Sequence, residues 1–174
     1  PGRLPWSNVT PAEAAQVCSA AGGNLCTQGQ FQIACQPNAA CTFGYNPRGG
    51  AGSACATLYT AVKYCNLAPS YDFNAAVAGD QDGLLPGGSA ALLNCWADWS
   101  ALQGNTGTNN RLFDLTGNLR EITASGGQFT LMGGSLLQRS ETGASCAFTF
   151  YGTDPGFSYF DTGFRCCFGS DPTQ

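Results

Sequence analysis

Ten cysteines and no histidine among 174 residues restrict what this chain can fold into more than any other feature of the sequence. Thiolate zinc sites nearly always contain a Cys-x-x-Cys pair, and the chain has none. An even number of cysteines at scattered spacings indicates instead about five disulfides formed in an oxidising compartment. The sequence therefore predicts a cross-linked protein that is secreted or displayed on a cell surface.

The missing histidine and the charge balance exclude several function classes. Without an imidazole there is no Ser-His-Asp or Cys-His machinery and no histidine metal ligand. The net charge is -4, and seven basic residues spread over the chain form no phosphate-binding stripe, so no nucleic-acid partner is expected. No apolar run approaches the roughly 20 residues of a membrane helix, so no membrane span is expected either.

The size and composition fit one folded domain. A chain of 174 residues with 43% hydrophobic residues can bury a core of its own. We expect the domain to cover residues 1–168 and the polar end of the chain, residues 169–174, to form a flexible tail.

Two short helices are expected near the start of the chain. In the first, Thr10 can cap the N-terminus, Pro11 suits the first helical position and Glu13 completes a capping box. The second is expected in the segment "TQGQFQIACQ", with Thr27 as its cap. Its apolar side chains are expected to face inward: Phe31, Ile33 and Cys35.

Long loops and short strands are expected in the rest of the chain. Gly, Asn, Pro, Ser and Asp interrupt residues 37–110 every few positions, and a loop region of this length is unusual unless disulfides or a metal hold it. Strand-like pieces follow residue 125: "QFTLMGG", "ASCAFTFYG" and "GFRCCFG". Helices first, loops next and strands last indicate an α+β domain.

Four phrases of the sequence fit together as the motifs of one known family. They are "LPWSNVTPAEAAQVCSAAGGNLCTQGQFQIAC", "FDLTGNLREIT", "LMGGSLLQRS" and "DTGFRCC", and they cover residues 5 to 168. Their order and spacing resemble the sulfatase-modifying-factor family, which comprises the formylglycine-generating enzymes and their non-catalytic relatives. The resemblance implies a fold similar to C-type lectins, with little regular secondary structure and long loops stapled by calcium and disulfides.

The residues that would carry the family's chemistry are absent. The enzymes of this family hold copper with two cysteines just after the Gly-Gly-Ser strand, which matches residues 133–135 here. The first cysteine position carries Gln138, and the second falls within 141–143, where there is no cysteine. Copper(I) needs soft thiolate ligands, so we expect no formylglycine-generating activity. The alternative is a divergent enzyme of this family, an oxidase or a hydrolase using acidic loop residues: Glu141, Asp154 and Asp161.

The resemblance also implies how some of the cysteines pair. It implies two bridges between the N-terminal helices and the C-terminal part of the chain: Cys18 with Cys166 and Cys35 with Cys146. Two further cysteines are extra relative to the enzymes and neighbour the first bridge, so they are expected to pair with each other: Cys26 and Cys167. The remaining four are expected to staple the loop region in an order that the sequence leaves open: Cys41, Cys55, Cys65 and Cys95.

One expected calcium segment lies in "FDLTGNLREI". Four of its residues match the positions that bind one calcium ion in the family, two through carboxylates and two through backbone carbonyls: Asp114, Gly117, Leu119 and Glu121. Calcium takes hard oxygen ligands of these kinds. The alternative is that Asp114 caps a turn and Glu121 pairs with Arg111 or Arg120.

A second expected calcium segment lies between residues 66 and 84, so up to two structural calcium ions are expected. The matching positions are the side chains of Asn66 and Asp82 and the carbonyls of Leu67 and Leu84. The spacing is longer than in the family, which makes Asp80 an alternative donor. The competing interpretation is a turn made by the Asp-Gly pair alone.

Together these patterns predict a non-catalytic extracellular binding, adhesion or assembly module on a lectin-like scaffold. The recognition surface is expected in the loops after Ser135, at Gln138, Arg139, Tyr151 and Tyr159, with Phe157 and Phe160 beside them. Aromatic side chains with arginine suit a glycan, peptide or protein ligand. Besides the divergent enzyme, a third hypothesis is a structural building block whose groove is filled by a neighbouring subunit.

Overall fold

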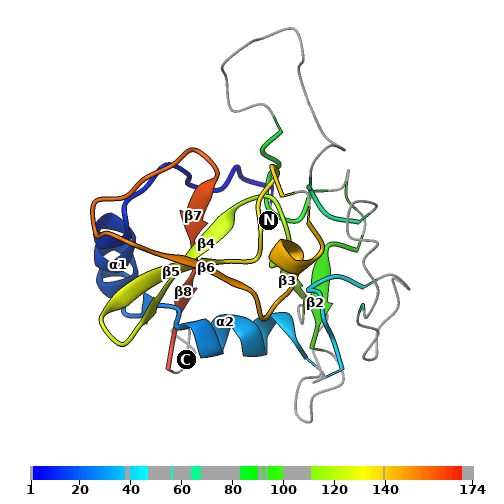
Figure 1. The fold of residues 1–174 in the computed structure, drawn as a ribbon, viewed down its shortest axis with the longest axis horizontal. Helices are drawn as coiled ribbons and strands as arrows, with labels where there is room; N and C mark the ends of the chain where they lie inside the picture. The colour runs from blue at the N-terminus through cyan, green and yellow to red at the C-terminus, as the bar shows by residue number, and fades with distance from the viewer. Residues whose placement is uncertain are drawn as a thin grey trace, which may run out of the picture.

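The computed structural model describes residues 2–37, 40–46, 56, 64–67, 83–89, 92, 94–99, 111–138 and 140–169. In these ranges, short helices and strands are joined by long irregular segments (Figure 1). The helices are α1 (Pro11–Ala20), α2 (Gln28–Cys35) and the 3-10 helix η2 (Thr142–Ala144). The mixture of helices and sheets confirms the predicted α+β class.

Both α-helices begin with a capping box. The Thr10 hydroxyl accepts a hydrogen bond from the Glu13 N–H at 3.2 Å, and the Glu13 carboxylate accepts one from the Thr10 N–H at 2.9 Å. Thr27 and Gln30 make the same two contacts at the start of α2. Each box satisfies two N–H groups that a helix start leaves without intrahelical partners. The predicted caps Thr10 and Thr27 are therefore confirmed.

The inward face of α2 differs from the sequence-based prediction at one position. Phe31 and Cys35 are 1% and 0% exposed, whereas Ile33 is 64% exposed. Residues 31 and 35 are about one turn apart, but residue 33 lies roughly 200° around the helix from residue 31. The prediction that Ile33 faces inward was therefore wrong.

The strands form one four-stranded sheet and two short pairs. The large sheet has the order β6-β5-β4-β7, in which β7 runs parallel to β4 and the other neighbours are antiparallel. Its strands are β4 (Arg120–Ser125), β5 (Gln128–Met132), β6 (Thr149–Thr153) and β7 (Thr162–Phe164). The pairs are β1 (Asn24–Leu25) with β8 (Cys166–Cys167) and β2 (Trp96–Asp98) with β3 (Arg111–Phe113). The strands expected after residue 125 are confirmed.

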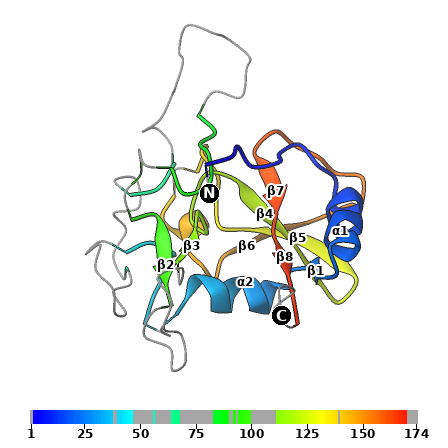
Figure 2. The same ribbon diagram turned by 180° about the vertical axis from the view of Figure 1, so that it is seen from behind.

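The two helices pack against opposite faces of the large sheet. Adjacent residues of a strand point to opposite faces. Leu131 of β5 packs in a cluster with Ala14 and Cys18 of α1, whereas the next residue, Met132, packs with Phe31 of α2. Figure 2 shows the sheet from behind, with α1 and α2 at different sides of it.

Disulfides connect the N-terminal helices to the C-terminal strands. The structure pairs Cys18 with Cys166, Cys26 with Cys167 and Cys35 with Cys146. The resemblance implied the first and third of these pairings, and the second was expected because its cysteines neighbour the first bridge. Because Cys166 and Cys167 are both in β8, this short strand is fixed to the end of α1 and to the chain just before α2.

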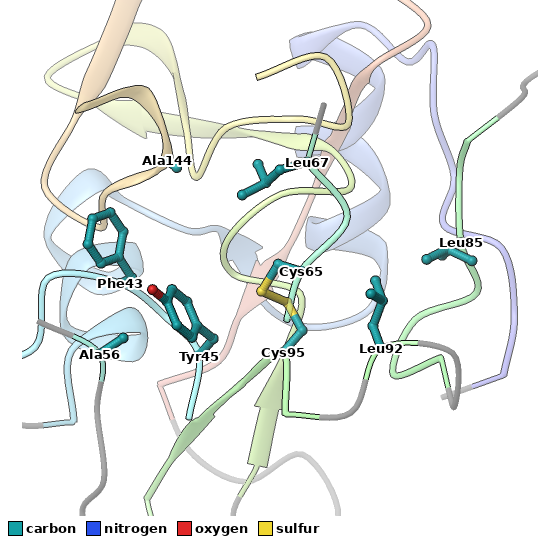
Figure 3. Close-up of a cluster of buried hydrophobic side chains, with 9 residues drawn as sticks. All are labelled: Phe43, Tyr45, Ala56, Cys65, Leu67, Leu85, Leu92, Cys95 and Ala144. Atoms are coloured by element: carbon teal, nitrogen blue, oxygen red, sulfur yellow. A yellow bond between two sulfur atoms is a disulfide. The ribbon is translucent and has the colours of Figure 1, made fainter. Parts of the chain in front are cut away.

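A fourth disulfide lies in a second core under the loop region. Cys65 pairs with Cys95, which settles part of the order that the sequence left open. This bridge packs among buried side chains from segments far apart in the chain, as Figure 3 shows: Phe43, Tyr45, Ala56, Leu67, Leu85, Leu92 and Ala144. Cys41 is disulfide-bonded as well, whereas Cys55 lies outside the described residues. The described loop segments therefore have a cross-linked core of their own.

Two further expectations concern the chain's ends and membranes. The tail expected at 169–174 lies, except for Gly169, outside the described residues, so it stays a prediction. Within the described ranges, no helix has the length and apolar character needed to cross a membrane.

Candidate ligand-binding pocket and calcium segments

Two consecutive glycines end β5 and set the direction of the following loop. Gly133 and Gly134 have φ values of 87° and 70°, a region that favours glycine. A Cβ at either position would lie within 2.9 Å of a backbone carbonyl oxygen of a neighbouring segment. The turn therefore needs both glycines, and it brings Ser135 into the interior, where the residue is 2% exposed.

A pocket of about 410 Å³ opens beside this turn. Its buried base consists of Arg120, Ser135 and Asp161, and its more exposed wall consists of Leu137, Gln138, Tyr151, Phe157 and Tyr159. Three of the four residues expected to bind a ligand, Gln138, Tyr151 and Tyr159, are thus brought together. The fourth, Arg139, lies outside the described residues.

The base of the pocket is a neutralised hydrogen-bonded network. Asp161 is fully buried and accepts hydrogen bonds from Nη2 of Arg120 at 2.6 and 2.7 Å. It also accepts one from the Ser135 hydroxyl at 2.6 Å. Nε of Arg120 is buried and has no hydrogen-bond partner among the described residues. The base therefore offers polar groups to a ligand without an unpaired carboxylate.

The wall of the pocket is unusually aromatic for a solvent-exposed surface. Tyr151 is 61% exposed and Tyr159 is 46% exposed. The Tyr151 ring meets Phe157 edge-on at 6.5 Å between centroids, and Tyr159 lies 4.8 Å from Phe160. These contacts hold the rings in place while leaving area free for a ligand. Such rings provide rigid apolar contact area next to polar groups.

The carboxylates considered for hydrolysis have different surroundings. Asp161 is committed to Arg120 and Ser135, while Glu141 and Asp154 are exposed on the surface. No two of these three carboxylates are placed together as a pair of catalytic acids. The divergent-hydrolase hypothesis thus gains no support from the described geometry.

Gln138, which the resemblance aligns with the first copper cysteine of the formylglycine-generating enzymes, makes a defined contact. Its Nε2 donates a hydrogen bond to the Ser140 hydroxyl at 2.7 Å, and its side chain lies directly against Gly143. Every cysteine among the described residues is in a disulfide. None of them therefore offers a thiolate to a metal at this pocket.

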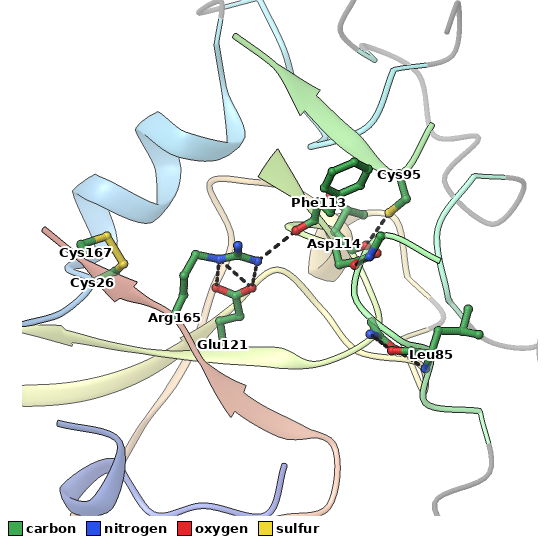
Figure 4. Close-up of polar contacts among 11 residues, drawn as sticks. Cys26, Leu85, Cys95, Phe113, Asp114, Glu121, Arg165 and Cys167 are labelled. Carbon is green, nitrogen blue, oxygen red and sulfur yellow. Dashed lines mark hydrogen bonds and ion pairs between the residues drawn. A yellow bond between two sulfur atoms is a disulfide. The ribbon is translucent and has the colours of Figure 1, made fainter. Parts of the chain in front are cut away.

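The segment 114–121 does not present the donor set of a calcium site. Both oxygens of Glu121 accept hydrogen bonds from Arg165, from Nη2 to Oε1 at 2.6 Å and from Nε to Oε2 at 3.0 Å (Figure 4). A calcium ion takes six to eight oxygens and would be repelled by a guanidinium at this place. The remaining donors, Asp114 and the carbonyls of Gly117 and Leu119, do not fit the ion without Glu121.

Asp114 has a different role in the structure. Its φ of 56° is unusual for a residue other than glycine, and its Oδ2 accepts a hydrogen bond from the Gly88 N–H at 2.7 Å. Burial raises the pKa of Asp114 above its ordinary value, because the Gly88 hydrogen bond and the nearby Arg165 only partly offset the loss of water. Asp114 thus holds the segment at Gly88 through a long-range hydrogen bond, whereas the alternative interpretation expected it to cap a turn.

The arginine partners differ from those that the alternative interpretation expected. Glu121 pairs with Arg165, not with Arg111 or Arg120. Arg120 pairs with Asp161, and the Arg111 guanidinium lies 4.0 Å from the centroid of the Trp96 ring. Sequence reasoning missed Arg165 although it lies in the quoted "DTGFRCC" phrase, since the parallel pairing of β4 with β7 is not visible in the sequence.

The other calcium segment keeps an unused oxygen at the expected place. Asn66 is 1% exposed, its Nδ2 donates hydrogen bonds to the Gly83 carbonyl and to Asn118, and its Oδ1 is a buried acceptor without a partner among the described residues. Leu67 and Leu84 are buried as well, and Asp82 lies outside the described residues. A buried acceptor left unpaired is costly, so the Oδ1 of Asn66 is compatible with the ligand position expected there.

Comparison with known proteins adds no family assignment. The chain matches no protein-family model, and a search of curated proteins finds no similar sequence. The likeness to the sulfatase-modifying-factor family therefore depends on the four phrases and on the residues described above.

Proposed function

We propose that this chain is a non-catalytic, extracellular binding module on a disulfide- and calcium-stabilised scaffold like that of the formylglycine-generating enzymes. The disulfides between distant segments support an oxidising compartment and hence a secreted or cell-surface location. The order of the four sequence phrases supports the scaffold. The absence of cysteine at position 138 and within 141–143 supports a role in binding rather than in copper chemistry.

The observation that carries the proposal is the pocket between the Gly133-Gly134 turn and the aromatic residues of β6 and of the loop after it. Exposed rings surround a base in which the two described charges, Arg120 and Asp161, neutralise each other. Rings of this kind stack on sugar faces or on apolar side chains, and the base supplies hydrogen bonds. The pocket thus suits an uncharged polar ligand, with a glycan or an uncharged peptide segment as the two sources.

The test is binding of the folded domain to a glycan array and a peptide array. The expected result is a set of related uncharged ligands whose binding falls at least tenfold in Tyr151→Ala and in Tyr159→Ala. Ile33→Ala is a matched control, since Ile33 is 64% exposed on α2 and contributes nothing to this pocket. Binding that survives both tyrosine variants, or that falls equally in the control, would place recognition elsewhere.

The calcium part of the proposal assigns one ion to the segment from Asn66 to Leu84. Its support is the buried, unpartnered Oδ1 of Asn66. The carboxylate of Asp82 and the carbonyls of Leu67 and Leu84 would complete the protein ligands. A bound ion would neutralise charge and hold the loop core in place.

The competing oxidase hypothesis has a direct experimental check. A copper-thiolate enzyme needs two reduced cysteines, so alkylation of the native protein before reduction would label them. We expect no label, because all described cysteines are paired. Labelling of two cysteines together with copper(I) binding would favour the oxidase.

A further inference from the structure

A larger pocket lies away from the one beside Gln138. It has a volume of about 740 Å³ and is bordered by the N-terminal segment at Pro5, by Gly87, by all of β3 and by the start of β4 and the end of β7. Its apolar lining consists mainly of Leu112, Phe113, Leu119 and Phe164. A pocket of this size fits a small organic molecule.

Four charged side chains line this pocket, and three of them already take part in an ion pair or a cation–π contact. Glu121 and Arg165 form a buried ion pair through both carboxylate oxygens, and Arg165 also donates to the Phe113 carbonyl at 3.0 Å. Arg111 lies at the opening, with its guanidinium over the Trp96 ring at 4.0 Å.

Asp114 is the fourth charge and has no ion-pair partner. The ion pairs within the described ranges are Arg120 with Asp161 and Arg165 with Glu121. Asp114 accepts one hydrogen bond at Oδ2, from Gly88, and no described donor reaches its Oδ1. Burial of this carboxylate is only partly offset by the Gly88 hydrogen bond and the nearby Arg165, so a cationic ligand group beside Oδ1 gains an electrostatic contact.

We propose that this pocket binds an organic monocation, a primary ammonium group carried on an apolar body. The ammonium would bind Asp114, and the apolar body would lie between the side chains of Phe113 and Phe164, whose ring faces also attract cations. Calcium is the wrong cation here, because the second carboxylate that it would need is bound to Arg165. This inference is independent of the ligand proposed for the pocket beside Gln138.

The experiment is a titration of the full chain with three probes of the same shape and different charge. The probes are 2-phenylethylammonium, 2-phenylethanol and 3-phenylpropionate, followed by calorimetry and by amide chemical shifts. We expect the ammonium probe to bind at least tenfold more tightly than the alcohol, and the carboxylate probe not to bind. The shifted amides should include those of Gly88 and Phe113, and added calcium should not displace the probe.

Two variants sharpen the test. Asp114→Asn keeps an oxygen for the Gly88 N–H and is a residue type that tolerates positive φ, and it should weaken ammonium binding at least tenfold. Leu112→Lys adds a cation at an exposed position of the pocket wall and should weaken the same probe without disturbing the core. Asp154→Asn is the matched control, because Asp154 is exposed and does not line this pocket.

The proposal can be tested even if Asp114→Asn does not fold, because the wild-type chain and Leu112→Lys give independent results. Equal affinity of the wild-type chain for the ammonium and the alcohol would overturn it, as would no binding of the ammonium at millimolar concentration. Unchanged binding in a folded Asp114→Asn variant would overturn it too. Selective ammonium binding that Leu112→Lys weakens and Asp154→Asn leaves intact supports it.

Discussion

Arg165 binds both carboxylate oxygens of Glu121, across 44 residues of sequence, with a closest distance of 2.6 Å. The pair joins the end of β7 to β4 at the place where the resembled family's calcium motif would need Glu121 as a ligand. The guanidinium supplies the positive charge that a metal ion would otherwise supply. The negative charge of Glu121 in β4 is therefore neutralised by Arg165, directly after β7, without a metal ion.

Breaking this pair from one side should be costly. Glu121→Gln removes the anion bonded to Arg165, whose side chain is 32% exposed and also lies near Asp114, and we expect a loss of about 2 kcal/mol in the free energy of unfolding. Urea unfolding with the disulfides intact measures it. Glu141→Gln, the same change at an exposed residue, should change the free energy by less than about 0.5 kcal/mol.

The double variant Glu121→Leu/Arg165→Met tests whether the loss comes from the orphaned charge. Replacing both partners removes the unpaired ion, so the double variant should be more stable than either single one. If Glu121→Gln unfolded at the same urea concentration as the wild type, the pair would contribute nothing measurable to the free energy of unfolding.

Calcium should stabilise the chain through one ion. We expect the melting temperature to rise with added calcium and to fall in excess chelator, with one ion bound per chain, because ligand binding to the folded state adds stability by mass action. Asp82→Asn should remove this dependence, whereas Glu121→Gln should leave it in place.

The matched variant for the calcium site is Asp80→Asn. It should retain the calcium response, since Asp82 directly precedes Gly83, whose carbonyl contacts Asn66. If Asp80→Asn, rather than Asp82→Asn, abolished the effect of calcium on the melting temperature, the carboxylate ligand would be Asp80. Equal melting temperatures in calcium and chelator would argue against any structural ion.

Local signals were predicted well from the sequence because their causes are local. The caps at Thr10 and Thr27 need only residues three positions apart, and the strands after residue 125 are short runs of β-forming side chains. Ile33 was placed wrongly because apolar character was weighed above its angle around α2.

Side-chain partners that are far apart in the chain could not be predicted from the sequence. Glu121 could have paired with a nearby arginine, but the parallel register of β4 with β7 places it opposite Gly163 and brings Arg165 to it. Asp161 seemed a possible catalytic acid until Arg120 and Ser135 proved to surround it. The pocket residues Gln138, Tyr151 and Tyr159 were found because a motif, rather than periodicity, pointed to their loops.

Asp114 should make stability depend on pH. Its pKa is raised above the ordinary value of 3.8 in the folded chain, so the folded state holds the proton more tightly than the unfolded state. The stabilisation that protonated Asp114 provides is therefore fully present at pH values below the unfolded-state pKa. It is lost as the pH rises through the raised pKa of the folded state. Asp114→Asn should therefore gain stability relative to the wild type at neutral pH and lose that advantage in acid. Urea unfolding at several pH values measures this, and Asp154→Asn, at an exposed position, should run parallel to the wild type.

The two adjacent bridges to β8 should be partly redundant. Alone, each would close a loop of more than a hundred residues, with sequence separations of 148 and 141. Once Cys18–Cys166 is formed, however, Cys26–Cys167 closes only the short path through β1. The Cys35–Cys146 bridge already shortens the large loop to roughly 37 residues. In the entropy model, losing the second bridge should then cost about 3 kcal/mol rather than the value of about 4 for that loop.

Losing both bridges should exceed the sum of the single losses by about 1 kcal/mol, because only then does the loop between Cys18 and Cys166 open as far as the Cys35–Cys146 bridge allows. The comparison uses Cys18→Ala/Cys166→Ala, Cys26→Ala/Cys167→Ala and the quadruple variant, each unfolded in urea with the remaining bridges intact. Strictly additive losses would mean that the two bridges do not share a loop in the unfolded chain. Alanine is the right replacement, since Cys18 and Cys26 are 0% and 1% exposed and a serine would bury an unpaired hydroxyl.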